Sequence, residues 1–347
     1  MRRFARTLAA VALAGTVVAG TAGWASGNTQ QAVTGPPPGS ASWRADGVLG
    51  RELPDPGRAT PDQVRQFFSG LSAADQHALL ERHPSVVGNL DGAPLELRYR
   101  ANARALRASQ DPRYARLAAP GRQILAFDPR GRGQVAEVFG DLRTARHVSV
   151  VVPGSDIDAG TFDRRGDVYG TPAGMAKSLY AGTGPGSAVI AWAGYTTPVG
   201  LGLDAATGKL AEAGAERLTR FTAGLAADGL PAPVVFCHSY GSVVCGLAAS
   251  GLGATDLVVL GSPGMRADDV AGLHTRARVW AAKDDTDWID DVPHVRVAGL
   301  GHGADPAGED FGARRVPAED AEGHTGYFAP GTDSLAAFTA IAQGVAR

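Results

Sequence analysis

Residues 234–250 read VVFCHSYGSVVCGLAAS, a pattern that predicts a strand, a sharp turn and a helix in succession. The β-branched and aromatic residues at its start predict a buried strand that ends at Cys237, and the small apolar residues from position 242 onward predict a helix. Ser239 lies in the sharp turn between them. Such a turn needs small residues two positions before and after the serine because the backbone is crowded there, and Cys237 and Gly241 meet that need. The pattern predicts that the Ser239 hydroxyl is held above the end of a sheet as a nucleophile.

The rest of the chain from residue 122 supports such a sheet. Short apolar runs alternate there with helical stretches and with Gly/Pro turns, which is typical of parallel strands joined by crossover helices. The sequence therefore predicts an α/β fold with a doubly wound, mostly parallel sheet. The seven expected strands are 123–127, 148–152, 188–193, 234–237, 256–260, 279–282 and 295–298. Ligands bind beyond the carboxyl ends of such strands, so the chemistry is expected in the loops that follow them.

A serine nucleophile of this kind needs a carboxylate and a histidine later in the chain, in that order. The loop after the strand at 279–282 offers Asp284, Asp285 and Asp287. Asp287 is preferred because its position in Asp-Trp-Ile resembles the usual placement of the acid after that strand. Asp285 is the alternative acid.

Two histidines follow the last expected strand and could be the base. His324 stands just before a final helix expected over 332–345, where the catalytic histidine of α/β-hydrolases usually lies. His302 is the alternative base, separated from that helix by a Gly/Pro-rich segment. In the expected triad, His324 takes the proton of Ser239, and Asp287 holds the imidazole in the right tautomer.

An oxyanion hole completes the expected site. Tyr240, directly after the nucleophile, supplies one backbone N–H, and the Gly-containing loop after 148–152 supplies the second, for which we prefer Ser155. His238 precedes the nucleophile and is expected to pack or to form hydrogen bonds rather than to act as the base. Loops around the site carry aromatic and apolar residues that hint at an acyl pocket. These residues are Phe162, Tyr169, Met175, Tyr180 and Tyr195.

The N-terminal residues read as an export signal. Three arginines, Arg2, Arg3 and Arg6, precede an apolar run over 8–22. The small residues of Gly23-Trp24-Ala25 then offer a site at which a signal peptidase could cleave. The run is shorter than the roughly 20 residues that span a bilayer, which favours cleavage near residue 25 over a retained anchor. The expected organisation is a signal peptide over 1–25, a disordered linker over 26–57, a helical preface over 58–120 and a hydrolase domain over 121–347.

Composition excludes several function classes. The formal net charge is -2 and no basic cluster occurs, so a nucleic-acid partner is not expected. Neither a dinucleotide fingerprint nor metal-ligand spacing of histidines is present, so no cofactor and no metal are expected. The two cysteines, Cys237 and Cys245, are expected to be unbridged core thiols, because a helix would carry them beyond the Cα separation of about 7 Å that a disulfide allows.

Several separate blocks resemble an actinobacterial α/β-hydrolase family catalogued as domain of unknown function 1023 (DUF1023). They are DGAP at 91–94, Arg98 with AN at 101–102, LAFDP at 125–129, GDL at 140–142, VPG at 152–154, HSYG at 238–241, GSPG at 261–264, and GH at 323–324 with Tyr327. The resemblance implies the α/β-hydrolase fold, the roles of Ser239 and His324, and export in many members. It departs from the family at Cys237, where glycine is usual, and at the Asp-rich loop 284–287.

The expected activity is that of an exported serine hydrolase acting on carboxylic esters, either lipid or small acyl esters, near the membrane or in the cell wall. Peptide or amide hydrolysis by the same triad is the alternative. A binding protein that keeps the fold without turnover is a further alternative from another class.

Overall fold

The computed structural model describes residues 29–346, and the signal segment expected over 1–25 lies outside them. Its centre is an eight-stranded sheet in the order β1-β2-β4-β3-β5-β6-β7-β8. The strands are β1 Gln123–Asp128, β2 Gln134–Gly140, β3 His147–Val152, β4 Ser187–Ala193, β5 Val234–His238, β6 Asp256–Leu260, β7 Arg278–Ala282 and β8 Arg314–Val316. The pairs from β4 to β8 are parallel, whereas β2 is antiparallel to both β1 and β4. The expected fold class is confirmed.

Six of the seven expected strands coincide with observed ones, and two observed strands were not expected. In β2, the polar Gln134 and Glu137 interrupt the apolar run, and Arg122 forms an ion pair with the buried Glu137 carboxylate. The strand β8 contains only three residues and two of them are exposed arginines. The strand expected over 295–298 is wrong: its valines are exposed and take part only in an isolated bridge between Val297 and Leu300.

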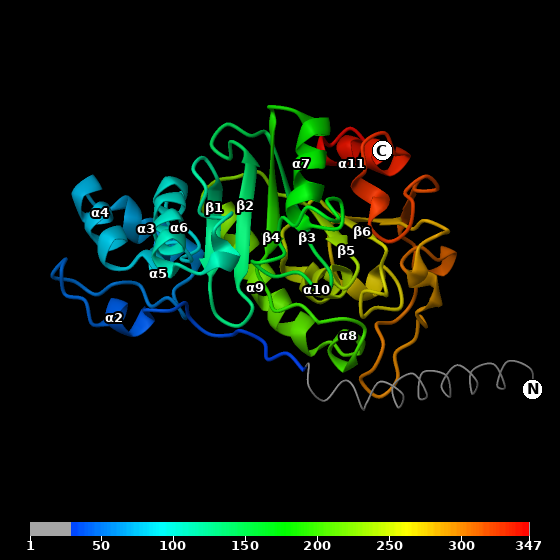
Figure 1. The fold of residues 1–347 in the computed structure, drawn as a ribbon, viewed down its shortest axis with the longest axis horizontal. Helices are drawn as coiled ribbons and strands as arrows, with labels where there is room; N and C mark the ends of the chain where they lie inside the picture. The colour runs from blue at the N-terminus through cyan, green and yellow to red at the C-terminus, as the bar shows by residue number, and fades with distance from the viewer. Residues whose placement is uncertain (1–28, 347) are drawn as a thin grey trace, which may run out of the picture.

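Helices cover both faces of the sheet (Figure 1). Helices α7 (Pro172–Thr183) and α11 (Asp333–Ala342) pack together on one face, and α9 (Lys209–Ala227) and α10 (Gly241–Ala248) pack together on the other. Each face has its own apolar core. A short helix, α8 (Leu203–Ala206), precedes α9. No helix among residues 29–346 combines the length and apolarity needed to cross a membrane.

The region expected as a helical preface contains α3 (Pro61–Ser69), α4 (Ala73–Arg82), α5 (Pro84–Val87) and α6 (Leu95–Ser109). The sequence Thr60-Pro61-Asp62-Gln63 has the pattern of a capping box, and the structure contains one: the Thr60 hydroxyl accepts from the Gln63 N–H, and the Gln63 side chain accepts from the Thr60 N–H. The Ser72 hydroxyl caps α4 by accepting from the Asp75 N–H. These helices have a separate apolar core and attach to the sheet where α6 packs on β1.

Residues 29–57 differ from the disordered linker expected over 26–57. They contain a short helix, α2 (Ser40–Arg44), and the side chain of Trp43 is fully buried against the preface. The Trp43 indole N–H donates to the Pro54 carbonyl at 2.7 Å, and its ring meets the His83 ring edge-on. One large aromatic residue in a Ser/Gly/Pro-rich segment is enough to anchor it, because burial of such a ring contributes several times the free energy of a small side chain.

Cys237 and Cys245 form a disulfide, so the expectation of two free thiols is wrong. Their Cα atoms are 6.4 Å apart because α10 begins directly after the turn and folds back over the end of β5. A larger Cα separation would result only if the strand and the helix continued in one direction. The bridge spans the turn that contains Ser239.

Removal of this bridge is expected to destabilise the protein. The double variant Cys237→Ala with Cys245→Ala should have a free energy of unfolding about 2 to 3 kcal/mol lower than the wild type, since the bridge restricts the unfolded chain by closing a short loop. Urea denaturation measures this difference, and the wild type unfolded with reductant provides a matched comparison. Equal denaturation midpoints for the variant and the oxidised wild type would contradict the bridge.

Candidate active site

Ser239 lies at the tip of the turn between β5 and α10, with a positive φ of 54°. A residue other than glycine adopts this conformation only where its surroundings impose it. The Ser239 N–H donates to the Leu260 carbonyl at 3.0 Å, which fixes the turn to the end of β6. Gly241 is needed because a Cβ there would lie 2.6 Å from the Val152 carbonyl oxygen. The Ser239 side chain is therefore presented at the carboxyl edge of the sheet.

His324 is paired with Asp287. Its Nδ1 lies 2.7 Å from Asp287 Oδ1, and Asp287 is almost fully buried. The other carboxylate oxygen accepts the Tyr327 hydroxyl at 2.7 Å, and Oδ1 also accepts the Ile289 N–H. Burial alone would raise the pKa of Asp287, but these hydrogen bonds, led by the one from His324, outweigh it and hold that pKa below its ordinary value. Asp287 is thus an ionised acceptor that fixes the proton of His324 on Nδ1.

The two neighbouring carboxylates do different work. Asp284 is buried and accepts from the N–H groups of Thr286 and Gly323, so it holds the loop that precedes His324. Asp285, the alternative acid, is exposed and forms no hydrogen bond or ion pair within residues 29–346. Of the three aspartates, the structure brings Asp287 to His324.

His238 supports His324 from the turn itself. Its Nε2 donates to the His324 carbonyl at 2.7 Å, and the two ring centroids are 4.7 Å apart. Burial, helped by the nearby His324 ring, lowers the pKa of His238 to about 3, so this side chain stays neutral. The expectation of a hydrogen-bonding role fits these contacts. Its partner could not be read from the sequence because it is a main-chain atom 86 residues away.

His302, the alternative base, has a different environment. Its Nε2 donates to the Ala205 carbonyl at 2.6 Å, and its ring meets the Tyr240 ring edge-on at 5.6 Å. Burial lowers its pKa to about 4. No carboxylate bonds to its Nδ1 in the described part of the chain. The arrangement gives His302 a packing contact beside the turn but no acidic partner.

The loop after β3 approaches the nucleophile closely. A Cβ on Gly154 would lie 2.5 Å from Ser239 Cβ, 2.9 Å from Ser239 Oγ and 3.1 Å from the Tyr240 backbone nitrogen. Within residues 29–346, neither the Tyr240 N–H nor the Ser155 N–H donates to another group. Two free donors next to a hydroxyl are the parts from which an oxyanion hole can be built.

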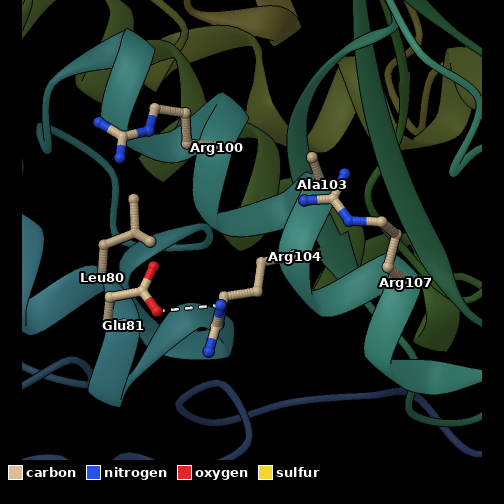
Figure 2. A pocket seen from close by; sticks show the side chains of 6 residues that line it. All are labelled: Leu80, Glu81, Arg100, Ala103, Arg104 and Arg107. Carbon is tan, nitrogen blue, oxygen red and sulfur yellow. Dashed lines mark ion pairs between the residues drawn. The ribbon is translucent and has the colours of Figure 1, made fainter.

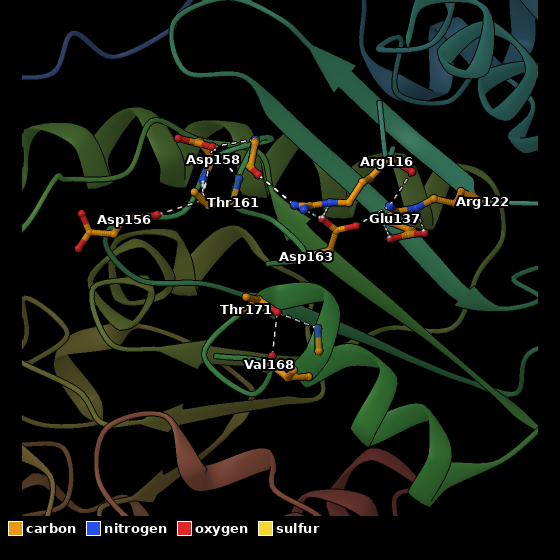
Figure 3. Close-up of polar contacts among 11 residues, drawn as sticks. Arg116, Arg122, Glu137, Asp156, Asp158, Thr161, Asp163, Val168 and Thr171 are labelled. Carbon is orange, nitrogen blue, oxygen red and sulfur yellow. Dashed lines mark hydrogen bonds and ion pairs between the residues drawn. The ribbon is translucent and has the colours of Figure 1, made fainter. Parts of the chain in front are cut away.

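Polar contacts hold the segment that follows this loop (Figure 3). Arg122 bonds to Asp163 at 2.6 Å and to Glu137, while Arg116 bonds to Asp163 from the other side. Asp158 accepts from the N–H and hydroxyl groups of Thr161. These contacts attach the segment to the residues that precede β1 and, through Arg122, to Glu137 of β2.

The expected acyl pocket differs from what the structure shows. Phe162 and Met175 are fully buried in the core between the sheet and α7, and Tyr180 packs against that core. Tyr195 is buried on the opposite face, where its hydroxyl donates to the Pro153 carbonyl. These four side chains pack in or against the apolar cores and do not line a pocket for the acyl group. Tyr169 is partly exposed and has no assigned contact with the site.

A pocket of about 340 Å³ lies away from these residues, between α4 and α6 (Figure 2). It is lined by Leu80, Glu81, Arg100, Ala103, Arg104 and Arg107. An ion pair of 2.9 Å joins Glu81 and Arg104 across it. It contains no nucleophile and no base, so it is not the candidate active site. Among the described residues, no three His, Cys, Asp or Glu side chains gather as metal ligands.

The close approach of Gly154 leads to a prediction. In Gly154→Ala, the added methyl group must displace the loop from Ser239, so labelling of Ser239 by a fluorophosphonate should slow by about 100-fold or more. Gly166→Ala is the matched control, because a Cβ at Gly166 meets no atom within 4 Å. Labelling rates are followed by intact-mass spectrometry. Equal rates for the two variants would be inconsistent with the close contact.

The two buried neutral histidines predict how stability depends on pH. The folded pKa values of His238 and His302 lie below that of an unfolded histidine, so only the unfolded chain takes up these protons as the pH falls below about 6.5. The free energy of unfolding should decrease from pH 6.5 towards pH 4, by about 1.4 kcal/mol per pH unit for each histidine. His238→Gln should remove one such contribution. Urea titrations at several pH values compare the slopes, and parallel slopes for the variant and the wild type would refute the assignment.

Comparison with known proteins bears on the fold of the chain. A family model described as alpha/beta hydrolase matches residues 128–297. Two Mycobacterium tuberculosis proteins described as uncharacterized, MT2140 of strain CDC 1551 / Oshkosh and Rv2079 of strain H37Rv, are each 28% identical over 375 aligned residues, which include 84% of this chain. The chain covers 57% of the length of these relatives.

Two solved structures are also similar. Esterase PE8 is 18% identical, with a TM-score of 0.39 over 60% of this chain and 97% of that one. XC6422 from Xanthomonas campestris, described as an a/b serine hydrolase without lid, is 17% identical, with a TM-score of 0.37 over 65% of this chain and 94% of that one. The family match to the strands and turns around Ser239, together with the sheet described above, shows that this chain has the α/β-hydrolase fold.

Proposed function

We propose that the protein is an exported serine hydrolase that cleaves carboxylic esters through an acyl-enzyme on Ser239. The observation that carries the proposal is the pairing of His324 Nδ1 with the buried, ionised Asp287 at 2.7 Å. This bond leaves Nε2 of His324 as the proton acceptor. His238 joins that histidine directly to the turn that presents Ser239.

The proposed reaction has two halves. In the first, His324 Nε2 takes the proton of Ser239 as Oγ attacks the ester carbonyl, and the negative charge on the carbonyl oxygen is stabilised by the N–H groups of Tyr240 and Ser155. The C–O bond of the ester then breaks, and the alcohol leaves with the proton from His324. In the second half, His324 takes a proton from water, the hydroxide attacks the acyl carbon, and Ser239 leaves with that proton as the acid is released.

Asp287 takes part in both halves of this cycle. Its carboxylate stabilises the imidazolium that His324 becomes in each half, and Tyr327 keeps the carboxylate charged and oriented by donating to Oδ2. We propose ester cleavage over amide cleavage because the alcohol of an ester leaves more easily than the amine of an amide. It therefore depends less on protonation by His324.

Export is proposed from the basic and apolar N-terminal sequence, and the disulfide is an independent support. Disulfides persist in oxidising compartments outside the cytoplasm and are rare within it. The bridge between Cys237 and Cys245 lies directly at the proposed nucleophile. An enzyme that works on the outer face of the cell membrane or in the cell wall would keep this disulfide.

A substrate panel tests the proposal. Wild-type protein should hydrolyse p-nitrophenyl acyl esters, and Ser239→Ala should reduce the rate to background. Asp287→Asn should lower kcat by about 10⁴-fold, because the imidazole then loses its tautomer and its counter-charge. Asp285→Asn is the matched control at the exposed neighbouring carboxylate and should keep the wild-type rate.

The same panel contains peptide p-nitroanilides. If only the p-nitroanilides are cleaved, the protein is a peptidase with the same triad and not an esterase. Ester turnover that survives in Ser239→Ala, or an Asp285→Asn loss as large as that of Asp287→Asn, would overturn the assignment of the residues.

A further inference from the structure

Exposed apolar side chains gather beside the candidate active site. Of the ten large hydrophobic residues that are exposed among residues 29–346, six belong to three segments near the site, and their exposed fractions range from 38% to 68%. We call these six the apolar rim: Leu201, Leu203, Trp288, Val295, Val297 and Leu300. Single exposed hydrophobic residues are ordinary on a protein surface, whereas their concentration in a few neighbouring segments is the pattern expected of an interaction site.

Main-chain contacts join two of these segments, the one around Leu203 and the loop over 295–301. The Gly301 N–H donates to the Ala206 carbonyl at 2.9 Å, and Thr207 forms a β-bridge with Leu300. His302 adds the hydrogen bond to the Ala205 carbonyl. Helix α8 and the loop over 295–301 therefore lie side by side, and each carries exposed leucine or valine side chains.

This pair of segments adjoins the residues proposed to carry the reaction. The Tyr240 hydroxyl donates to the Thr207 carbonyl at 2.8 Å, so α8 is tied to the residue after the nucleophile. The third segment reaches the site from the other side, where the Trp288 ring lies 4.4 Å from the His324 ring. The apolar rim thus flanks both the expected oxyanion donor and the expected base.

The N-terminal segment meets the body at α8. The Gln30 N–H donates to Asp204 Oδ2 at 2.5 Å, so the described chain begins against α8 (Figure 1). The sequence that precedes it contains the apolar run over 8–22. Seven residues separate this run from Gln30, so while the run is held in a bilayer, no more than about 30 Å of extended chain joins that bilayer to α8.

We propose that the apolar rim docks on a lipid surface and delivers acyl esters from that surface to Ser239. Transfer of apolar side chains from water to lipid is favourable by about 25 cal/mol per Å². Two arginines beside the rim, Arg266 and Arg296, bond through their side chains to nearby carbonyls, and long cationic side chains suit the border between lipid and water. The delivery step rests on the proposed function, whereas the docking step does not.

The test measures contact with lipid at one position of the rim. Full-length Ser239→Ala protein carries Leu203→Cys, labelled with the environment-sensitive dye NBD, and Val48→Cys is the matched control at an exposed valine of the segment 29–57. The two natural cysteines are bridged to each other, so the introduced one takes the label. With phosphatidylcholine vesicles, the label at position 203 should shift to the blue and brighten several-fold, while the label at position 48 should not change. Leu201→Cys is a second labelling position should Leu203→Cys fail to fold.

A second substitution tests whether the rim acts as one surface. Val297→Asp added to the labelled Leu203→Cys protein should weaken vesicle binding at least tenfold, and Val345→Asp, at an exposed valine near the C-terminus, should not. Equal responses at positions 203 and 48, or no response at either, would overturn the proposal. A response at position 203 that follows protein concentration without vesicles would instead assign the rim to a second copy of the chain. Because Ser239 is absent, these outcomes are independent of whether the protein hydrolyses esters.

Discussion

The backbone turn at Ser239 is the constraint on which the rest of the site depends. A serine with φ of 54° is unfavourable by itself, and the surrounding chain holds it there. Gly154 and Gly241 allow the loop after β3 to lie against the turn, the Ser239 N–H bonds to the end of β6, and the disulfide at Cys237 closes the turn from behind. A larger residue at either glycine would move the loop or the hydroxyl.

The histidine is fixed to this turn by contacts of a different kind. Gly261, at a positive φ, lies so close to the pair that a Cβ there would be 2.8 Å from Asp287 Oδ2 and 3.1 Å from the His324 ring. Asp287 and Tyr327 set the imidazole from one side, and His238 holds the His324 main chain from the other. The neutral state of His238 matters because a charged imidazole this close would disfavour the imidazolium that His324 must form.

Features that depend on a local pattern could be predicted from the sequence, and features that depend on distant contacts could not. The strand, turn and helix around Ser239 and the capping box at Thr60 lie within short windows, and the pairing of Asp287 with His324 follows the chain order of the fold. The disulfide could not be predicted from the helical rise per residue, because that estimate assumes one direction for the chain. The turn at Ser239 reverses the direction and brings Cys237 and Cys245 together. The strand β2 was missed because its buried Glu137 is neutralised by Arg122, a partner 15 residues away.

Covalent modification of Ser239 is the most direct measure of the central claim, that this turn carries a nucleophile. Wild-type protein is treated with a fluorophosphonate and the adduct is located by peptide mass mapping. We expect one adduct per chain, on the peptide that contains Ser239, and its loss when His324→Gln removes the base. An adduct on another residue, or an unmodified Ser239 in folded, oxidised protein, would show that this turn does not carry the nucleophile.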